Sequence, residues 1–227
     1  MNKHILLTVL ALGTTVVTSA SAQDAKPLSS SLVATRADAP VLFAPRGWRI
    51  ERQVNGDLNR DRVPDAALVL VDNGAATVGG RPAPRQRALV VLVREGKGFR
   101  RVGFNNTLLL GTRDGGVLYS GGITPVNVTI QRGVLHINQE NGSRGVLDTT
   151  HKFRYDGKFH IMLIGFDSVE RDRLTGAARS ISTNYSTGVQ RTTTIAAESD
   201  TITRSRMRVS RKLRRLEEIK GEERYSE

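Results

Sequence analysis

The side chains most suggestive of chemistry gather in one short segment, residues 57–65, which directly precedes an apolar run at 66–71. Oxygen-bearing side chains recur there at alternate positions and again at the end, namely Asp57, Asn59, Asp61 and Asp65. A hard cation such as Ca²⁺ takes about six to eight oxygen ligands from a tightly curled backbone. The residue types and their spacing therefore predict a Ca²⁺ site.

A metal-free alternative competes for the same loop. Arg60 and Arg62 place positive charge beside the carboxylates, and this charge opposes the entry of a cation. Asp and Asn side chains also accept hydrogen bonds from the amides of their own turns. An Asx-rich turn that caps its own backbone without a metal therefore stands beside the Ca²⁺ site as an interpretation.

The elements that position this loop are expected to be strands. Apolar residues alternate with polar ones or form short runs, and no stretch before residue 204 shows a convincing helical period. The expected strands are residues 48–54, 66–71, 87–94, 99–103, 126–131, 134–139, 149–155, 158–166 and 201–209, with two more divided by Gly188. Arg132-Gly133 and Asp156-Gly157 indicate hairpin turns, and the second signal favours a type I′ turn. We expect an all-β, antiparallel meander in a single domain, either as one curled sheet or as a partial propeller of two or three small sheets.

The N-terminal residues have the pattern of a secretory signal peptide. A positive start at Lys3 precedes a mostly apolar stretch at 5–17, and Ala20 and Ala22 occupy the small-residue cleavage positions. We expect cleavage between Ala22 and Gln23, and therefore a periplasmic or extracellular protein. No later apolar run is long enough to predict a membrane span.

The remaining chain divides by composition. Residues 1–22 are the expected signal peptide, 23–46 a flexible lead-in rich in Ser, Ala and Pro, 47–209 the β domain and 210–227 a charged tail. The sequence contains no cysteine, which excludes disulfides and thiol chemistry. Stability must therefore come from packing and from any bound ion.

Motifs of catalysis do not stand out in this sequence. There is no H-E-x-x-H helix motif and no G-x-S-x-G elbow, and His136 and His160 fall on or beside expected strands. The carboxylates of Asp167, Glu170 and Asp172 would serve a glycosidase only at a suitable separation. We therefore expect a protein that is not an enzyme, with a site assembled from distant residues as the remaining enzymatic alternative.

The charge distribution suggests a different role. The net charge is +12, and Arg204, Arg206 and Arg208 alternate so that a strand would place them on one face. The patch is extended by Arg211, Lys212, Arg214 and Arg215. Such a row could contact the phosphates of an anionic envelope component, whereas the scarcity of aromatic residues argues against nucleic acid. The alternative is an edge strand that its charges protect from aggregation.

The loop also resembles a known type. Residues 57–65 resemble the calcium loops of FG-GAP and VCBS-type repeats, and residues 48–191 are similar to exported bacterial proteins of unknown function that carry one such loop. This resemblance implies Ca²⁺ ligands at Asp57, Asn59, Asp61 and Asp65, together with the main-chain carbonyl of Val63. The chain departs from the pattern at Arg62, where the repeats have a glycine suited to positive φ. The resemblance implies a structural loop in an exported, non-catalytic β-rich protein and transfers no activity.

Overall fold

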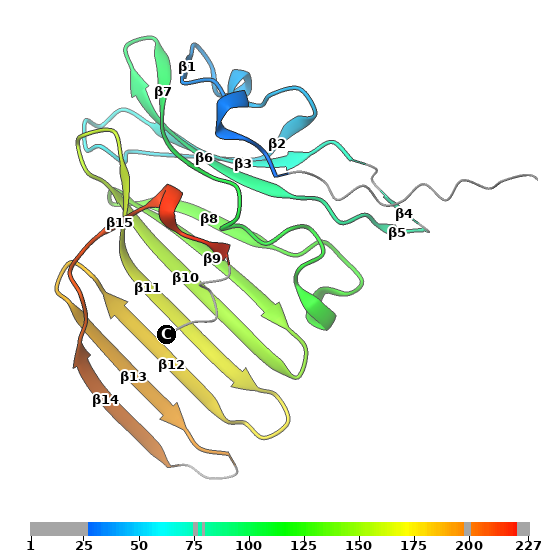
Figure 1. Cartoon of the computed structure of the whole chain (residues 1–227), viewed down its shortest axis with the longest axis vertical. Helices are drawn as coiled ribbons and strands as arrows, with labels where there is room; N and C mark the ends of the chain where they lie inside the picture. Colours follow the sequence, from blue (N-terminus) through cyan, green and yellow to red (C-terminus); the bar gives the residue numbers. More distant parts are fainter. Residues whose placement is uncertain (1–26, 75–76, 79, 198–200, 222–227) are drawn as a thin grey trace, which may run out of the picture.

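The apolar runs of the sequence form the middle of a five-stranded antiparallel sheet. The computed structural model describes residues 27–74, 77–78, 80–197 and 201–221 (Figure 1). The strand order in this sheet is β1-β7-β6-β3-β2. Its strands are β1 (Arg36–Ala37), β2 (Trp48–Gly56), β3 (Asp65–Asp72), β6 (Arg87–Glu95) and β7 (Gly98–Asn105).

Strands β3 and β6 are buried on both faces, as their nearly continuous apolar sequences predict. The side chains alternate between two hydrophobic clusters, so that Leu68 and Leu70 face one layer while Ala67 and Val69 face the other. The first layer comes from the N-terminal segment, and the second comes from the other large sheet. The five-stranded sheet is therefore the central layer of the molecule.

The second large sheet has eight antiparallel strands in the order β14-β13-β12-β11-β10-β9-β8, with β15 paired to β11. Its strands are β8 (Val126–Gln131), β9 (Val134–Gly142), β10 (Gly145–Tyr155), β11 (Ile161–Asp172), β12 (Ala178–Asn184), β13 (Val189–Ile195), β14 (Ile202–Arg208) and β15 (Arg214–Arg215). The sheets approach each other at strands β2 and β8, where a Cβ at Gly56 would lie 2.6 Å from Cγ2 of Ile130. Figure 1 shows β12, β13 and β14 extending away from the five-stranded sheet.

The remaining elements are short. A two-stranded sheet pairs β4 (Thr77–Val78) with β5 (Arg81–Pro82). The 3-10 turns are η1 (Ser30–Leu32), η2 (Pro40–Phe43), η3 (Gly116–Tyr119) and η4 (Leu216–Glu218). The prediction of an all-β, antiparallel, single-domain protein is confirmed, with two large sheets of five and eight strands. Among the described residues, no helix has the length and apolarity needed to cross a bilayer.

Two hairpins show how local sequence decides the turn. At Arg132-Gly133 both residues have positive φ, 53° and 74°, which is the two-residue turn that the sequence indicates. At Asp156-Gly157 the hairpin exists, but the predicted two-residue turn is wrong. The loop runs from 156 to 160, because Asp156 Oδ1 accepts hydrogen bonds from the amides of Lys158 and His160. Positive φ then falls at Gly157 and Phe159.

The expected boundaries of the β domain were too narrow. Residues 27–46, expected as part of a flexible lead-in, pack on the five-stranded sheet and bury Leu28 and Phe43. At the other end, the expected charged tail carries β15 and η4 and buries Leu216 and Ile219 in the core between the sheets. The expected signal segment 1–22 and its cleavage point lie outside the described residues.

Candidate functional site

The acidic loop joins β2 to β3 and is curled by its own side chains. Asp57 accepts hydrogen bonds from the amide of Arg60 at 2.5 Å and from that of Arg62 at 2.9 Å. Both arginines have positive φ, 67° and 70°. The loop therefore adopts at Arg62 the conformation for which a glycine would be favoured, and the Asp57 carboxylate stabilises it there.

The next two side chains continue this pattern. Asn59 Oδ1 accepts from the Asp61 amide at 3.0 Å, and Asn59 Nδ2 donates to Asp61 Oδ2 at 2.8 Å. Asp61 Oδ1 accepts from the Val63 amide at 2.7 Å. These contacts are the side-chain-to-amide bonds of the Asx-rich turn.

Asp65 differs from the rest of the loop because its side chain is fully buried at the start of β3. Its Oδ2 accepts from the amides of Leu58 and Asn59 at 2.8 and 3.2 Å, and its Oδ1 accepts from the amide of Arg94 on β6 at 2.8 Å. Burial raises the pKa of the Asp65 carboxyl, although the three amide bonds act in the opposite direction. Asp65 thus ties the loop to the neighbouring strand and holds Leu58 in the core.

The predicted metal-ligand residues are therefore close in space, but their side-chain oxygens accept hydrogen bonds from backbone amides. Asp57, Asn59 and Asp61 each accept an amide hydrogen bond through a side-chain oxygen, and these bonds curl the loop without requiring a cation. Within the described residues, no group of three or more His, Cys, Asp or Glu is arranged to hold a metal ion. The Ca²⁺ site remains a prediction.

The basic row falls on β14, which is the edge strand of the eight-stranded sheet and is exposed along its whole length. Arg204, Arg206 and Arg208 share the face that points away from the five-stranded sheet. Arg191 on β13 lies directly opposite Arg206 and joins them on that face. We call these four residues the arginine edge. Strands β12, β13 and β14 contain no acidic residue, and within the described chain the arginine edge forms no ion pair.

The tail does not extend this patch as predicted. Arg211 lies at the turn between β12 and β13, where its Nε donates to the carbonyl of Ser186 at 3.1 Å, and Lys212 is exposed next to it. Arg214 and Arg215, however, pair with Leu163 and Met162 on β11, across β12 and β13 from the edge. The chain returns to β11 because Leu216 of η4 and Ile219, which directly follows η4, anchor it in the core.

On the same face of the sheet, the pattern of charges differs between β14 at the edge and the strands β9, β10 and β11. On β10 and β11, Lys152 forms an ion pair with Asp167, which also accepts a hydrogen bond from Ser182 Oγ at 2.8 Å. Arg171 is likewise paired with Glu140 at 2.8 Å. Sequence reasoning missed this division between paired and unpaired cations, because it depends on which residues lie opposite each other across the strands.

Of the carboxylates considered for catalysis, Glu170 and Asp172 lie two positions apart on β11 and line one small cleft of about 270 Å³. Asp167 and Glu170 lie an odd number of positions apart on β11 and therefore point to opposite faces. Asp172 accepts hydrogen bonds from the amides of Leu174 and Thr175, and these bonds, together with Arg144, lower the pKa of its carboxyl.

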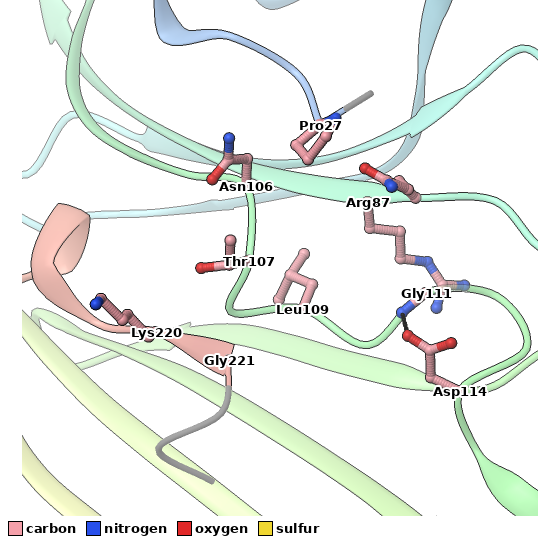
Figure 2. A pocket seen from close by; sticks show the side chains of 10 residues that line it. Pro27, Arg87, Asn106, Thr107, Leu109, Gly111, Asp114, Lys220 and Gly221 are labelled. Carbon is pink, nitrogen blue, oxygen red and sulfur yellow. Dashed lines mark hydrogen bonds between the residues drawn. The ribbon is translucent and has the colours of Figure 1, made fainter. Parts of the chain in front are cut away.

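Clefts lie between the sheets and the terminal segments. One cleft has a volume of about 520 Å³. Figure 2 shows it with Asn106 and Leu109 on one side and Lys220 on the other. The buried guanidinium of Arg87 reaches it, but it is held by Glu51 at 2.5 and 2.7 Å and by the carbonyls of Leu110 and Thr124. A second cleft of about 770 Å³ adjoins Asn106 and is lined by residues of β7 and by Glu217. The Arg87 contacts brace the fold and offer no nucleophile.

Comparison with known proteins adds no relative to this picture. No protein-family model matches the chain, and neither a curated protein nor a solved structure shows significant similarity to it. The resemblance to FG-GAP and VCBS-type loops therefore rests on the sequence of the loop and its neighbours. Fold and site together define an all-β protein with a self-capped acidic loop and a basic, solvent-exposed sheet edge.

Proposed function

We propose that the protein is an exported, non-catalytic binding protein that holds an anionic polymer of the cell envelope on the arginine edge. The observation that carries this proposal is the position of Arg191. Charge on an outermost strand protects a sheet from aggregation, which accounts for arginines on β14. Strand β13 is paired on both sides, so edge protection gives no reason for a cation there.

The arrangement also opposes folding electrostatically. Arg191 and Arg206 lie directly opposite each other on neighbouring strands, and like charges in such pairs are destabilising. On the same face, Lys152 is compensated by Asp167 and Arg171 by Glu140, whereas Arg154 on β10 forms no ion pair within the described chain. An anion seated between Arg191 and Arg206 would relieve the repulsion. The net charge of +12 would favour its approach over a longer range.

The proposal is tested by binding to immobilised heparin and to lipopolysaccharide over a range of salt concentrations. Changing Arg204, Arg206 and Arg208 together to Gln should weaken binding at least tenfold. It should also reduce the dependence of log K on log[salt] by about two to three, because each neutralised charge contributes about 0.7 to 0.9 to that slope.

The matched control removes equal charge from the other sheet. Arg46, Arg49 and Arg52 are exposed on and before β2, and their joint change to Gln should leave most of the binding intact. Equal losses in the two triple variants would show that net charge alone drives retention and would overturn the assignment. Retention that is insensitive to salt would contradict it as well.

A further inference from the structure

We infer that the arginine edge is a one-faced track, aligned with β14, for a linear polyol phosphate carrying one phosphodiester per about 7 Å. This inference rests on the proposed function and specifies its ligand. It combines the spacing of the cations, the charge of the neighbouring strands and the composition of β12, β13 and β14.

The spacing follows from strand geometry. Arg204, Arg206 and Arg208 occupy alternate positions of β14, so their Cα atoms repeat about every 6.8 Å and span about 14 Å. A glycerol phosphate chain has the same number of backbone bonds between successive phosphates as a peptide has between alternate residues. Extended alongside β14, such a chain would bring successive phosphates to successive arginines.

The central position is the strongest. Cβ atoms of directly opposite residues are about 4.5–5.5 Å apart, so the guanidinium groups of Arg191 and Arg206 can reach one phosphate from two strands. Guanidinium groups bind phosphate oxygens through paired, charge-assisted hydrogen bonds. A phosphate at this point would separate two like charges that otherwise repel each other.

The direction of the polymer follows from the carboxylates further along the same face. The row that begins at Arg206 and Arg191 continues through Ser182 on β12 to Asp167 on β11. A polyanion crossing the strands would therefore meet Asp167, and Asp148 and Glu140 lie on the same face beyond it. Running along β14 and β13 keeps the polymer over strands that contain no carboxylate within their described bounds.

The composition favours a polyol over a nucleic acid. Single-stranded nucleic acids are held largely by stacking of bases on aromatic side chains, and β12, β13 and β14 contain no aromatic residue. They present hydroxyl groups instead. Ser180, Ser182 and Thr193 lie on the same face as the arginines and can hydrogen-bond to the hydroxyls of a polyol.

The decisive variant exchanges two neighbouring side chains. Ser205→Arg combined with Arg206→Ser keeps composition and net charge but moves one cation to the other face of β14. Both positions are exposed, so the fold should be retained. Affinity for poly(glycerol phosphate) should fall at least tenfold, whereas a change below twofold would overturn the one-faced track. Arg191→Gln, a single change on β13, should weaken binding at least threefold and gives an independent readout if the exchange variant does not fold.

Binding measurements with different ligands identify the polymer and separate this inference from the proposed function. For the wild-type protein, affinity should rise with glycerol phosphate oligomers up to about three phosphates, the number that a 14 Å track accommodates, and then level off. Tighter binding of oligothymidylate of equal charge, or of anionic lipid vesicles, would overturn the polyol assignment. If the wild-type protein binds heparin, and the exchange variant binds poly(glycerol phosphate) as tightly as the wild type does, only the one-faced track is refuted. If wild type binds no polyanion, both proposals fail.

Discussion

Replacing Asp65 offers the sharpest test of how the acidic loop works. Its carboxylate is fully buried and accepts three amide hydrogen bonds, from Leu58, Asn59 and Arg94. Hydrogen bonds to charged groups contribute about 1.5–3 kcal/mol each, and removing the acceptor leaves buried amides unsatisfied. Relief of the desolvation of the carboxylate offsets part of this loss. We expect Asp65→Ala to lower the free energy of unfolding by about 3–5 kcal/mol.

Two comparisons make the test specific. Asp65→Asn can keep the two bonds made by Oδ2, but its amide group would face the Arg94 amide donor to donor, so we expect a loss of about 1–3 kcal/mol. Asp61→Ala removes an exposed loop contact and should cost about 0.5–1 kcal/mol, the scale of a capping bond. Urea unfolding in EDTA measures all three. If Asp65→Ala costs no more than Asp61→Ala, Asp65 does not clamp the loop to β6.

The pH dependence of stability tests the environment of the same group. Burial raises the pKa of Asp65 above 3.8 in the folded protein, so the folded state binds the proton more tightly than the unfolded state. The contribution of Asp65 protonation to the free energy of unfolding is complete below pH 3.8, and it is lost as the pH rises through the pKa of the folded state. The advantage of wild type over Asp65→Asn should therefore shrink across that window. An advantage that grows with pH would mean that the amide bonds outweigh burial.

Three other variants probe the core and the loop. Arg87→Met should lower the free energy of unfolding by about 3–5 kcal/mol in urea titrations, because it leaves Glu51 without its bidentate partner; a loss below 1 kcal/mol would contradict this. Leu216→Ala should cost about 2–5 kcal/mol, and a neutral result would show that the tail is not part of the core. If the loop binds Ca²⁺, millimolar Ca²⁺ should raise Tm relative to EDTA and Asp57→Ala should abolish the rise, whereas an unchanged melt would refute the metal site.

The strands were predictable because their burial repeats at short range. The apolar runs at 66–71 and 87–94 indicate strands covered on both faces, and β3 and β6 are buried in that way. The alternation around Arg132-Gly133 likewise locates β8, β9 and the turn between them. In each case the signal lies within about ten residues, and neighbouring side chains decide the conformation.

Errors arose where anchoring residues stand singly among polar neighbours. Phe43 is fully buried in a segment without periodicity, and Leu216 is fully buried within a run of charges. Composition therefore predicted a lead-in and a tail at places where one side chain secures the chain to the core. Local sequence also does not determine the register between two strands. The pairing of Arg191 with Arg206 is therefore visible only in the structure, where β13 and β14 are aligned.

Folding explains the arrangement of the side chains in the acidic loop, but it does not explain the arrangement of the arginine edge. Asp57, Asn59, Asp61 and Asp65 all bond to amides of the protein, so the structure gives each oxygen-bearing group a role in forming the turn. Within the described chain the arginine edge has no comparable compensation, and the alignment of β13 with β14 adds a repulsion between two of its members. Polar groups that stabilise the fold need no ligand to explain their arrangement, whereas neither folding nor edge protection explains the pairing of Arg191 with Arg206. The arginine edge is therefore the more informative place to look for the function of this protein.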